Sequence, residues 1–281
     1  MGLSTSMPLP GLARIAHATD FSPQSHTAFQ HALRLAVAAR CRLDILHVRD
    51  PDAEESWDAF PRVRQTLAEW EMLESAARPE EIETQLGVKV AKIEIKSAAP
   101  AQGLSEFLVG HRPDLLVAAT HGRTGLSRLL SGSVSQEVVA RASVPTLLIG
   151  PRTRPFVDPG SGTLRLAGVL MPVADHPARA LEALAHLMGP AGLSLEAVDA
   201  IAVGLALPDL VAVEGRAVPV RALSGPVAET ILEAAAETRC DLIVMPTAGR
   251  HGFLDGLRGS TTQQVLPAAP CPVLSLPLRH A

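Results

Sequence analysis

The sequence predicts an α/β fold in which two copies of one parallel-sheet domain follow each other along the chain. Short apolar runs alternate with amphipathic helical patterns, and this alternation occurs twice. Of the 281 residues 47% are hydrophobic but only 3% are aromatic, so Leu, Val, Ile and Ala must build the interior. Strands that alternate with helices pair in parallel through right-handed crossovers, which gives open sheets with helices on both faces.

In the first copy the first helix is the best-marked element. Ser22 can cap it, Pro23 suits the first helical position, and Ala28, Leu33 and their neighbours form one apolar face. The predicted strands are residues 14–19, 43–48, 88–95, 114–119 and 146–149. The later helices are predicted at residues 61–85, 103–109 and 133–142.

The second copy repeats this scheme after a boundary at residues 151–162, which contain three prolines and two glycines. We therefore expect one domain at 1–152 and a second at 163–281. The predicted strands of the second copy are residues 166–171, 195–203, 217–223, 241–245 and 272–276, and its helices are 178–188, 226–238 and a last one that begins at 260. Only residues 204–214 stand where the first copy has its long acidic helix, so we expect the second domain to lack that helix.

Charge and lysine content argue against two classes of phosphate binding. The net charge is −4, whereas binding to a nucleic-acid backbone needs clustered positive charge, so we expect no nucleic-acid partner. A phosphate loop of the Gly-Lys-Ser/Thr type is also excluded, because none of the three lysines is in that context. These lysines are Lys89, Lys92 and Lys96.

Cysteine usage and hydropathy indicate a protein of the cytoplasm. Cys41, Cys240 and Cys271 are odd in number and have no Cys-x-x-Cys spacing, so neither a disulfide scaffold nor a zinc site is expected. No apolar run reaches the ~18 residues that a membrane span needs, so we expect no membrane partner.

Each copy has a glycine loop between its fourth strand and its last helix. Gly122 and Gly249 are each followed, after nine residues, by a Gly-Ser pair that opens a helix with a capping box. Glycines let a ligand approach the backbone, and a helix N-terminus attracts phosphate. In an open α/β sheet the ligand crevice lies where the winding direction reverses, so Asp20, after the first strand, is expected to flank it. Asp20 can accept a ribose hydroxyl or contact a metal on the phosphates, or it can order the start of the first helix.

These motifs resemble those of the universal stress proteins, whose hallmark is Gly-x2-Gly-x9-Gly-Ser/Thr after the fourth strand. The resemblance covers nearly the whole chain as two tandem domains. It implies two tandem five-stranded sheets with the strand order 3-2-1-4-5, a Rossmann-like, adenine nucleotide alpha hydrolase-like fold. In the ATP-binding branch of the family it also implies an adenine nucleotide in the crevice.

Carried over position by position, the resemblance implies a set of nucleotide-binding residues in the first copy. They are Ala18, Thr19, Asp20, Val48, Ala118, Ala119, Gly122, Arg123, Gly132, Ser133, Val134 and Ser135. The first hallmark glycine is replaced by Ala119 here and by Pro246 in the second copy, which also has Ala174 where the acid is expected. A weaker second site is implied at Gly249, Gly259, Ser260, Thr261 and Thr262, so we expect one nucleotide per chain.

The expected function is that of a cytoplasmic, adenine-nucleotide-binding regulatory protein of the stress response. ATP is the expected ligand, with AMP and ADP left open, and Mg is expected only through the bound nucleotide. No catalytic residue is proposed, because the sequence has neither a nucleophile elbow nor paired carboxylates, so ATP hydrolysis would be slow and incidental. No protein metal ligands are expected. The alternative is a dimerisation scaffold with a vestigial crevice.

A third hypothesis is a nucleotide-activating enzyme of a related fold. Such an enzyme would need a Ser-Gly-Gly-x-Asp-Ser type loop after the first strand, and the sequence has none.

The fifth strands, residues 146–149 and 272–276, are expected to be apolar sheet edges, which invite pairing with another strand. We therefore expect the two domains to pair within one chain, as in the homodimers of single-domain relatives. A homodimer of whole chains is a second option that no feature of the sequence fixes.

Overall fold

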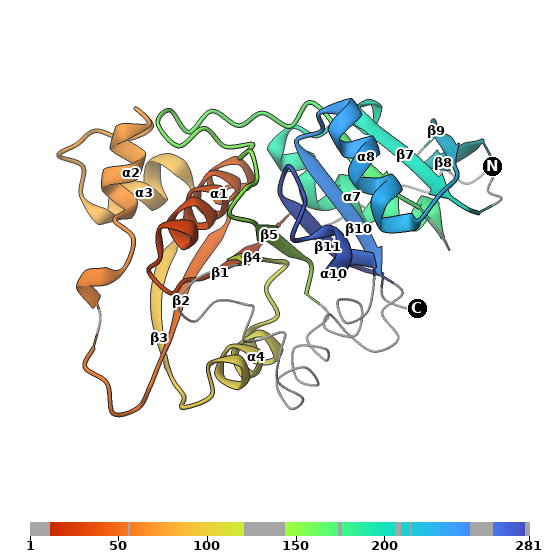
Figure 1. Cartoon of the computed structure of the whole chain (residues 1–281). Coiled ribbons are helices and arrows are strands. Elements are labelled where there is room, and N and C mark those ends of the chain that lie inside the picture. Colours follow the sequence, from red (N-terminus) through yellow and green to blue (C-terminus); the bar gives the residue numbers. More distant parts are fainter. Residues whose placement is uncertain are drawn as a thin grey trace, which may run out of the picture.

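The computed structural model describes residues 12–55, 57–120, 144–173, 176–205, 209–213, 215–247 and 261–278. Its described strands form one continuous 11-stranded sheet in the order β3-β2-β1-β4-β5-β11-β10-β6-β7-β9-β8. Figure 1 shows the two halves of the chain side by side with β5 and β11 between them. The predicted α/β class and the order 3-2-1-4-5 are confirmed, but the two expected sheets are joined into one.

The first half contains five parallel strands with helices on both faces. Ser22 caps the first helix as predicted, because its Oγ accepts the Ser25 N–H at 3.1 Å. The strands are β1 (Arg14–Ala18), β2 (Arg42–Arg49), β3 (Val90–Lys96), β4 (Leu115–Ala119) and β5 (Thr146–Ile149). The helices are α1 (Pro23–Ala39), α2 (Val63–Glu69), α3 (Pro79–Leu86) and α4 (Pro100–His111), with a short 3-10 helix at Trp57–Ala59.

The single long helix expected at residues 61–85 is wrong, since the structure has two helices there. Helix α2 ends at Glu69, and Glu71 adopts a left-handed conformation with φ +57°. The Met72 N–H then bonds back to the Leu67 carbonyl at 2.9 Å, which is the bond of a Schellman motif. Pro79 lacks an N–H and disfavours helix in the residue before it, so it begins α3 rather than continuing α2.

The second half repeats the first with one change at its outer edge. Strand β8 pairs antiparallel with β9 as a hairpin, in place of the first half's α2 and α3. Its strands are β6 (Val169–Pro172), β7 (Val198–Val203), β8 (Leu210–Val213), β9 (Arg216–Leu223), β10 (Leu242–Thr247) and β11 (Val273–Pro277). Its described helices are α7 (Pro177–Met188), α8 (Val227–Thr238) and α10 (Thr261–Val265), with 3-10 helices at Gly189–Ala191 and Leu195–Ala197.

The core has two layers that lie on opposite faces of the sheet. Helices α1, α2, α3 and α7 pack on one face in a single apolar cluster that runs through both halves. Helix α4 covers the other face in the first half, while α8 and α10 cover it in the second. Among the residues that the structure describes, no helix combines the length and the apolar character that a membrane span requires.

The fifth strands pair with each other, as the edge-strand argument predicts. Strand β5 runs antiparallel to β11, with Leu148 opposite Val273 and Thr146 opposite Ser275. Both strands are completely buried. Neither fifth strand therefore remains an open edge.

The segment between the halves is fixed to both of them by buried side chains and by side-chain hydrogen bonds to backbone carbonyls. Phe156 and Val157 are buried in the cluster that contains α1. The Trp70 indole N–H donates to the Pro159 carbonyl at 3.0 Å. On the other side, the Arg154 guanidinium donates to the carbonyls of Arg239 at 2.7 Å and Cys240 at 2.9 Å.

Gly162 is a point of close contact between this segment and the first half. Its φ is +65°, and a Cβ added there would lie 2.4 Å from the Trp70 ring. We expect Gly162→Ala to lower the free energy of unfolding by about 3 kcal/mol, from the left-handed backbone and the overlap together. Gly192→Ala is the matched control, because φ is +86° there but nothing lies within 4 Å. Urea unfolding of both variants measures the difference, and equal losses would contradict the overlap with Trp70.

The three cysteines are buried free thiols. The Sγ atoms of Cys240 and Cys271 lie 3.6 Å apart, beyond the ~2.05 Å of a disulfide bond. These two residues stand just before β10 and β11, 31 positions apart in the sequence. Their spacing in the sequence therefore gives no sign that they meet.

Candidate functional site

The carboxyl ends of β1 and β4 form the point where the winding of the first sheet reverses. Strand β1 pairs with β2 on one side and with β4 on the other, and Ala18 is opposite both Leu46 and Ala118. Ligands of open α/β sheets bind beyond the carboxyl ends of the strands at such a reversal. The structure thus brings the predicted residues Ala18, Thr19 and Asp20 to the same edge of the sheet as Ala118 and Ala119.

The turn from β1 into α1 is held by side-chain hydrogen bonds. The Thr19 hydroxyl oxygen accepts the Phe21 N–H at 3.1 Å and the Ser25 hydroxyl at 2.9 Å. One Asp20 carboxylate oxygen accepts the Ser22 N–H at 3.0 Å. Asp20 therefore orders the loop before the helix while Ser22 supplies the cap, so one of the two roles proposed for Asp20 is present in the structure.

The predicted small and apolar residues divide between the two faces of the sheet. Ala18, Val48 and Ala118 belong to or border the cluster under α4, at the ends of three neighbouring strands. Ala119 belongs to the cluster under α1 and is only 6% exposed. Its methyl group is therefore part of the core on the face opposite to Ala18 and Ala118.

Two histidines of the strands, His17 and His47, adjoin the site. His17 is fully buried, and its Nδ1 lies 3.1 Å from the Val117 carbonyl oxygen. Burial lowers the pKa of His17 from 6.5 to about 4, although the Val117 bond opposes this shift. His47 places Nδ1 2.9 Å from the Thr19 carbonyl oxygen. His17 is thus neutral at pH 7, and neither ring belongs to a metal cluster within the described residues.

An aromatic cluster that the sequence analysis did not anticipate lies beside Thr19. The Phe21 ring is 4.1 Å from that of His47 and 5.4 Å from that of Phe60, measured between centroids. Trp57 stacks on Phe60 at 5.5 Å and is 46% exposed. These residues come from three separate segments, and no spacing in the sequence links them.

The glycine loops of both halves, and Ala174 after β6, lie outside the described residues. This applies to Gly122, Arg123, Gly132, Ser133, Val134 and Ser135 in the first half, and to Ala174, Gly249, Gly259 and Ser260 in the second. Of the second set, Thr261 and Thr262 are described and begin α10, where Thr262 is buried. Pro246 lies within β10 and has no N–H to offer a ligand.

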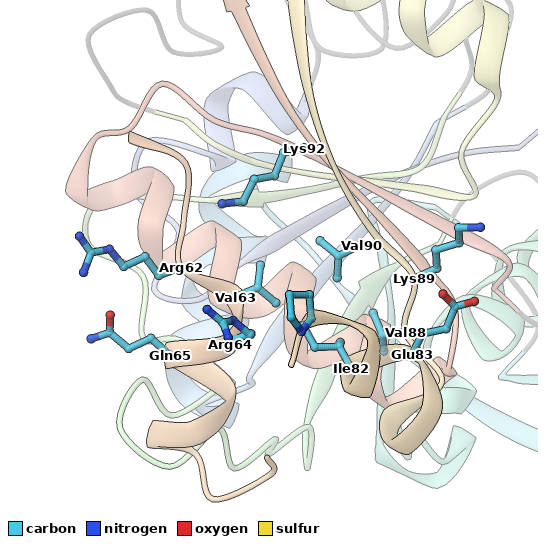
Figure 2. Close-up of a pocket in the computed structure, with 11 residues that line it drawn as sticks. Arg62, Val63, Arg64, Gln65, Ile82, Glu83, Val88, Lys89, Val90 and Lys92 are labelled. Atoms are coloured by element: carbon cyan, nitrogen blue, oxygen red, sulfur yellow. The ribbon is translucent and has the colours of Figure 1, made fainter. Parts of the chain in front are cut away.

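A cavity of about 710 Å³ lies apart from this crevice, between α2, α3 and the outer strand β3. Figure 2 shows its lining, which includes none of the residues predicted to bind nucleotide.

Comparison with known proteins decides the family. The family model described as "Universal stress protein family" matches residues 12–150 and 164–277. The chain belongs to the universal stress protein family. Two matched stretches within one chain make it a tandem member of that family.

Curated relatives are similar to about half of the chain. A universal stress protein of Methanocaldococcus jannaschii is 31% identical over 142 residues, which are 48% of this chain and 81% of the relative. One of Thermus aquaticus is 48% identical over 128 residues, 42% of this chain and 90% of the relative. The crystal structure of an Archaeoglobus fulgidus universal stress protein aligns over 94% of this chain and 96% of its own, with a TM-score of 0.59 and 20% identity. At that identity the solved structure supports the fold alone.

Proposed function

We propose that the first half of this universal stress protein binds one adenine nucleotide, ATP, beyond the carboxyl ends of β1 and β4. The observation that carries the proposal is the position of Asp20 at the reversal point of the sheet, beside the strand that leads into the Gly122–Ser135 segment. An acid at this point can accept ribose hydroxyls or contact a magnesium ion carried by the nucleotide. The Val48 backbone would contact the adenine, and the glycine loop would hold the phosphates.

The second half is proposed to bind nucleotide more weakly or not at all. Pro246 removes a backbone donor from β10, and Ala174 stands where the first half has an acid. Helix α10 also ends at Val265, two residues before Pro267, so its described part is only five residues long. One nucleotide per chain is the expected stoichiometry, and two equivalent sites in a titration would contradict it.

The nucleotide is proposed to act as a regulatory ligand rather than as a substrate. In this scheme the protein is a cytoplasmic stress-response module whose ATP-bound and free forms engage partners differently. The alternative is a ligand-free scaffold that supplies a dimerisation surface. One observation favours a scaffold in which this surface acts within the chain, namely the pairing of the two halves through β5 and β11.

Mass spectrometry of the denatured, freshly purified protein distinguishes these two functions. Co-purified adenine nucleotide supports the regulatory proposal, and the mass identifies ATP, ADP or AMP. A protein free of nucleotide that also fails to bind ATP in calorimetry would overturn the proposal in favour of the scaffold.

Asp20→Asn tests the residue that carries the proposal. The amide oxygen can still accept the Ser22 N–H, so the loop is kept while the charge is lost. Loss of one charge-assisted hydrogen bond, worth about 1.5–3 kcal/mol, should raise the Kd for ATP roughly 10- to 100-fold. Combining Asp20→Ala with Gly132→Val should abolish binding, since the valine would block approach to the backbone.

The matched control is Asp50→Asn. Asp50 follows β2 and also accepts a backbone N–H two residues on, that of Asp52 at 3.0 Å. This variant should bind ATP like the unmodified protein. Equal affinity in all the variants would show that Asp20 only orders its loop.

A further inference from the structure

The cavity between α2, α3 and β3 has an apolar floor. Val63 of α2, Ile82 of α3 and Val88 are buried, and Val90 of β3 completes this surface. Its volume of about 710 Å³ is within the range of ligand pockets, ~300–1,000 Å³.

The rim of the cavity is strongly basic, although the protein as a whole has a net charge of −4. Four cationic side chains and one carboxylate, Glu83, line it, and the cations are Arg62, Arg64, Lys89 and Lys92. Among the described residues, no carboxylate oxygen lies within 4.0 Å of any of these four groups. The rim therefore holds positive charge that the described part of the chain does not neutralise by direct pairing.

The neighbouring acids are directed elsewhere. Residues 69–83 contain six glutamates, yet only Glu83 lines the cavity. Glu81 instead pairs with Arg78 at 3.5 Å, outside the cavity. Charges of opposite sign are thus separated over a short stretch of chain, and the positive side chains line the cavity.

Protection of a sheet edge accounts for only part of this pattern. Strand β3 is an outer strand, and lysines on such strands discourage pairing with another sheet. This explanation suits Lys92 and Lys96, but Arg64 lies on α2 and Arg62 just before it. The Lys92 ammonium also lies 5.8 Å from the centroid of the Phe60 ring, and partial burial lowers the pKa of Lys92.

Figure 2 shows how the charges are distributed along the cavity. In this view Arg62 and Lys92 project on one side of the apolar side chains, whereas Lys89 and Glu83 project on the other. The first side has positive charge alone, and the second has both signs. The second half of the protein has the β8–β9 hairpin at its outer edge instead of α2 and α3, so this cavity belongs to the first half only.

We propose that this cavity binds a monocarboxylate with a hydrocarbon body, its carboxylate between Arg62 and Lys92 and its apolar part against Val63, Val88 and Val90. The site is separate from the proposed nucleotide crevice and does not depend on it. A carboxylate between two cations gains charge-assisted hydrogen bonds, while the apolar floor gains from excluding water.

The test uses the full chain and the fluorescent anion 1-anilinonaphthalene-8-sulfonate as probe. We expect saturable binding of one probe molecule, displacement by decanoate, and at least tenfold weaker displacement by decanol, which has the same chain length without the charge. Arg62→Gln and Lys92→Gln should each weaken decanoate binding about tenfold. Lys96→Gln is the matched control, since Lys96 lies on the same strand but does not line the cavity, and it should bind like the unmodified protein.

Several results would overturn the proposal. Equal displacement by decanol and decanoate would remove the role of the charges, and equal weakening in the Lys96 and Lys92 variants would make the effect one of general charge. Displacement of the probe by ATP would show that the probe binds in the proposed nucleotide crevice and not in this cavity. Absence of probe binding by a protein with an unchanged circular dichroism spectrum would show that the cavity does not bind an apolar anion. Val90→Glu, which adds a negative charge to the floor, should weaken decanoate binding at least tenfold.

Discussion

At pH 5 the folded protein is expected to be about 4 kcal/mol less stable than at pH 8 because of two buried histidines, His17 and His31. Burial lowers the pKa of each imidazole from 6.5 to about 4. Between these two values the unfolded chain binds a proton on each ring and the folded protein does not. Each histidine therefore removes about 1.4 kcal/mol of stability per pH unit as the pH falls from 6.5 toward 4. Above pH 6.5 both rings are neutral in both states, so this contribution is constant.

His31 is the better residue for testing this prediction, because it is remote from the proposed crevice. Its Nδ1 lies 2.8 Å from the Thr27 carbonyl oxygen, and its ring packs edge-on against Phe156 at 4.6 Å. In urea unfolding at pH 5, 6, 7 and 8, His31→Leu should remove about half of the pH-dependent loss, about 2 kcal/mol at pH 5.

Phe156→Leu serves as the control for this measurement. It removes the ring contact of His31 without removing the titrating group, so stability should fall by a similar amount at every pH. If His31→Leu retains the full dependence on pH, the buried histidines are not its source.

Much of the fold could be predicted because the local signals agree with each other. The Ser22 cap, the apolar strands and the repeated alternation of strand and helix all indicate a parallel sheet, and the structure has it. The prediction of one helix at residues 61–85 was wrong because the apolar spacing of the sequence continues across a turn at Glu71. Pro79 was the signal that could have corrected it, since a proline inside a helix costs about 3 kcal/mol.

The features that sequence reasoning missed depend on contacts between distant segments. The basic cavity joins residues of α2, α3 and β3, and its cations become a group only when the two helices fold against the outer strand. The aromatic cluster of Phe21, His47 and Phe60 likewise joins three segments. In the crevice the residues beside the strands could be named from the motif. The face of the sheet on which Ala119 lies could not be named from the motif. It follows from the position of Ala119 in β4 and from its neighbours under α1.

The two halves, produced as separate chains of residues 1–162 and 163–281, are expected to associate one to one. Cutting after Gly162 keeps Phe156 and Val157 with the first half, in whose core they are buried. The strand pair β5–β11 and the Arg154 bonds to the carbonyls before β10 would then act between chains. In the intact protein the covalent link supplies a high effective concentration, so the separate halves should bind more weakly than they do when joined.

The first half alone is expected to form a homodimer through β5, because its apolar strand would then be an open edge. The Leu116 and Thr120 N–H groups donate to the carbonyls of Pro145, just before β5, and of Ile149, so these two carbonyls face β4. Since backbone groups alternate along a strand, Thr146 and Leu148 face β11. Leu148→Pro therefore removes one of the two backbone N–H donors of the open edge and should give a monomer in light scattering. Addition of the second half should dissociate the homodimer and give a heterodimer of the two halves, since β11 is the native partner of β5. A first half that is monomeric at high concentration and does not bind the second half would show that the linker, and not the strand pair, holds the two halves together.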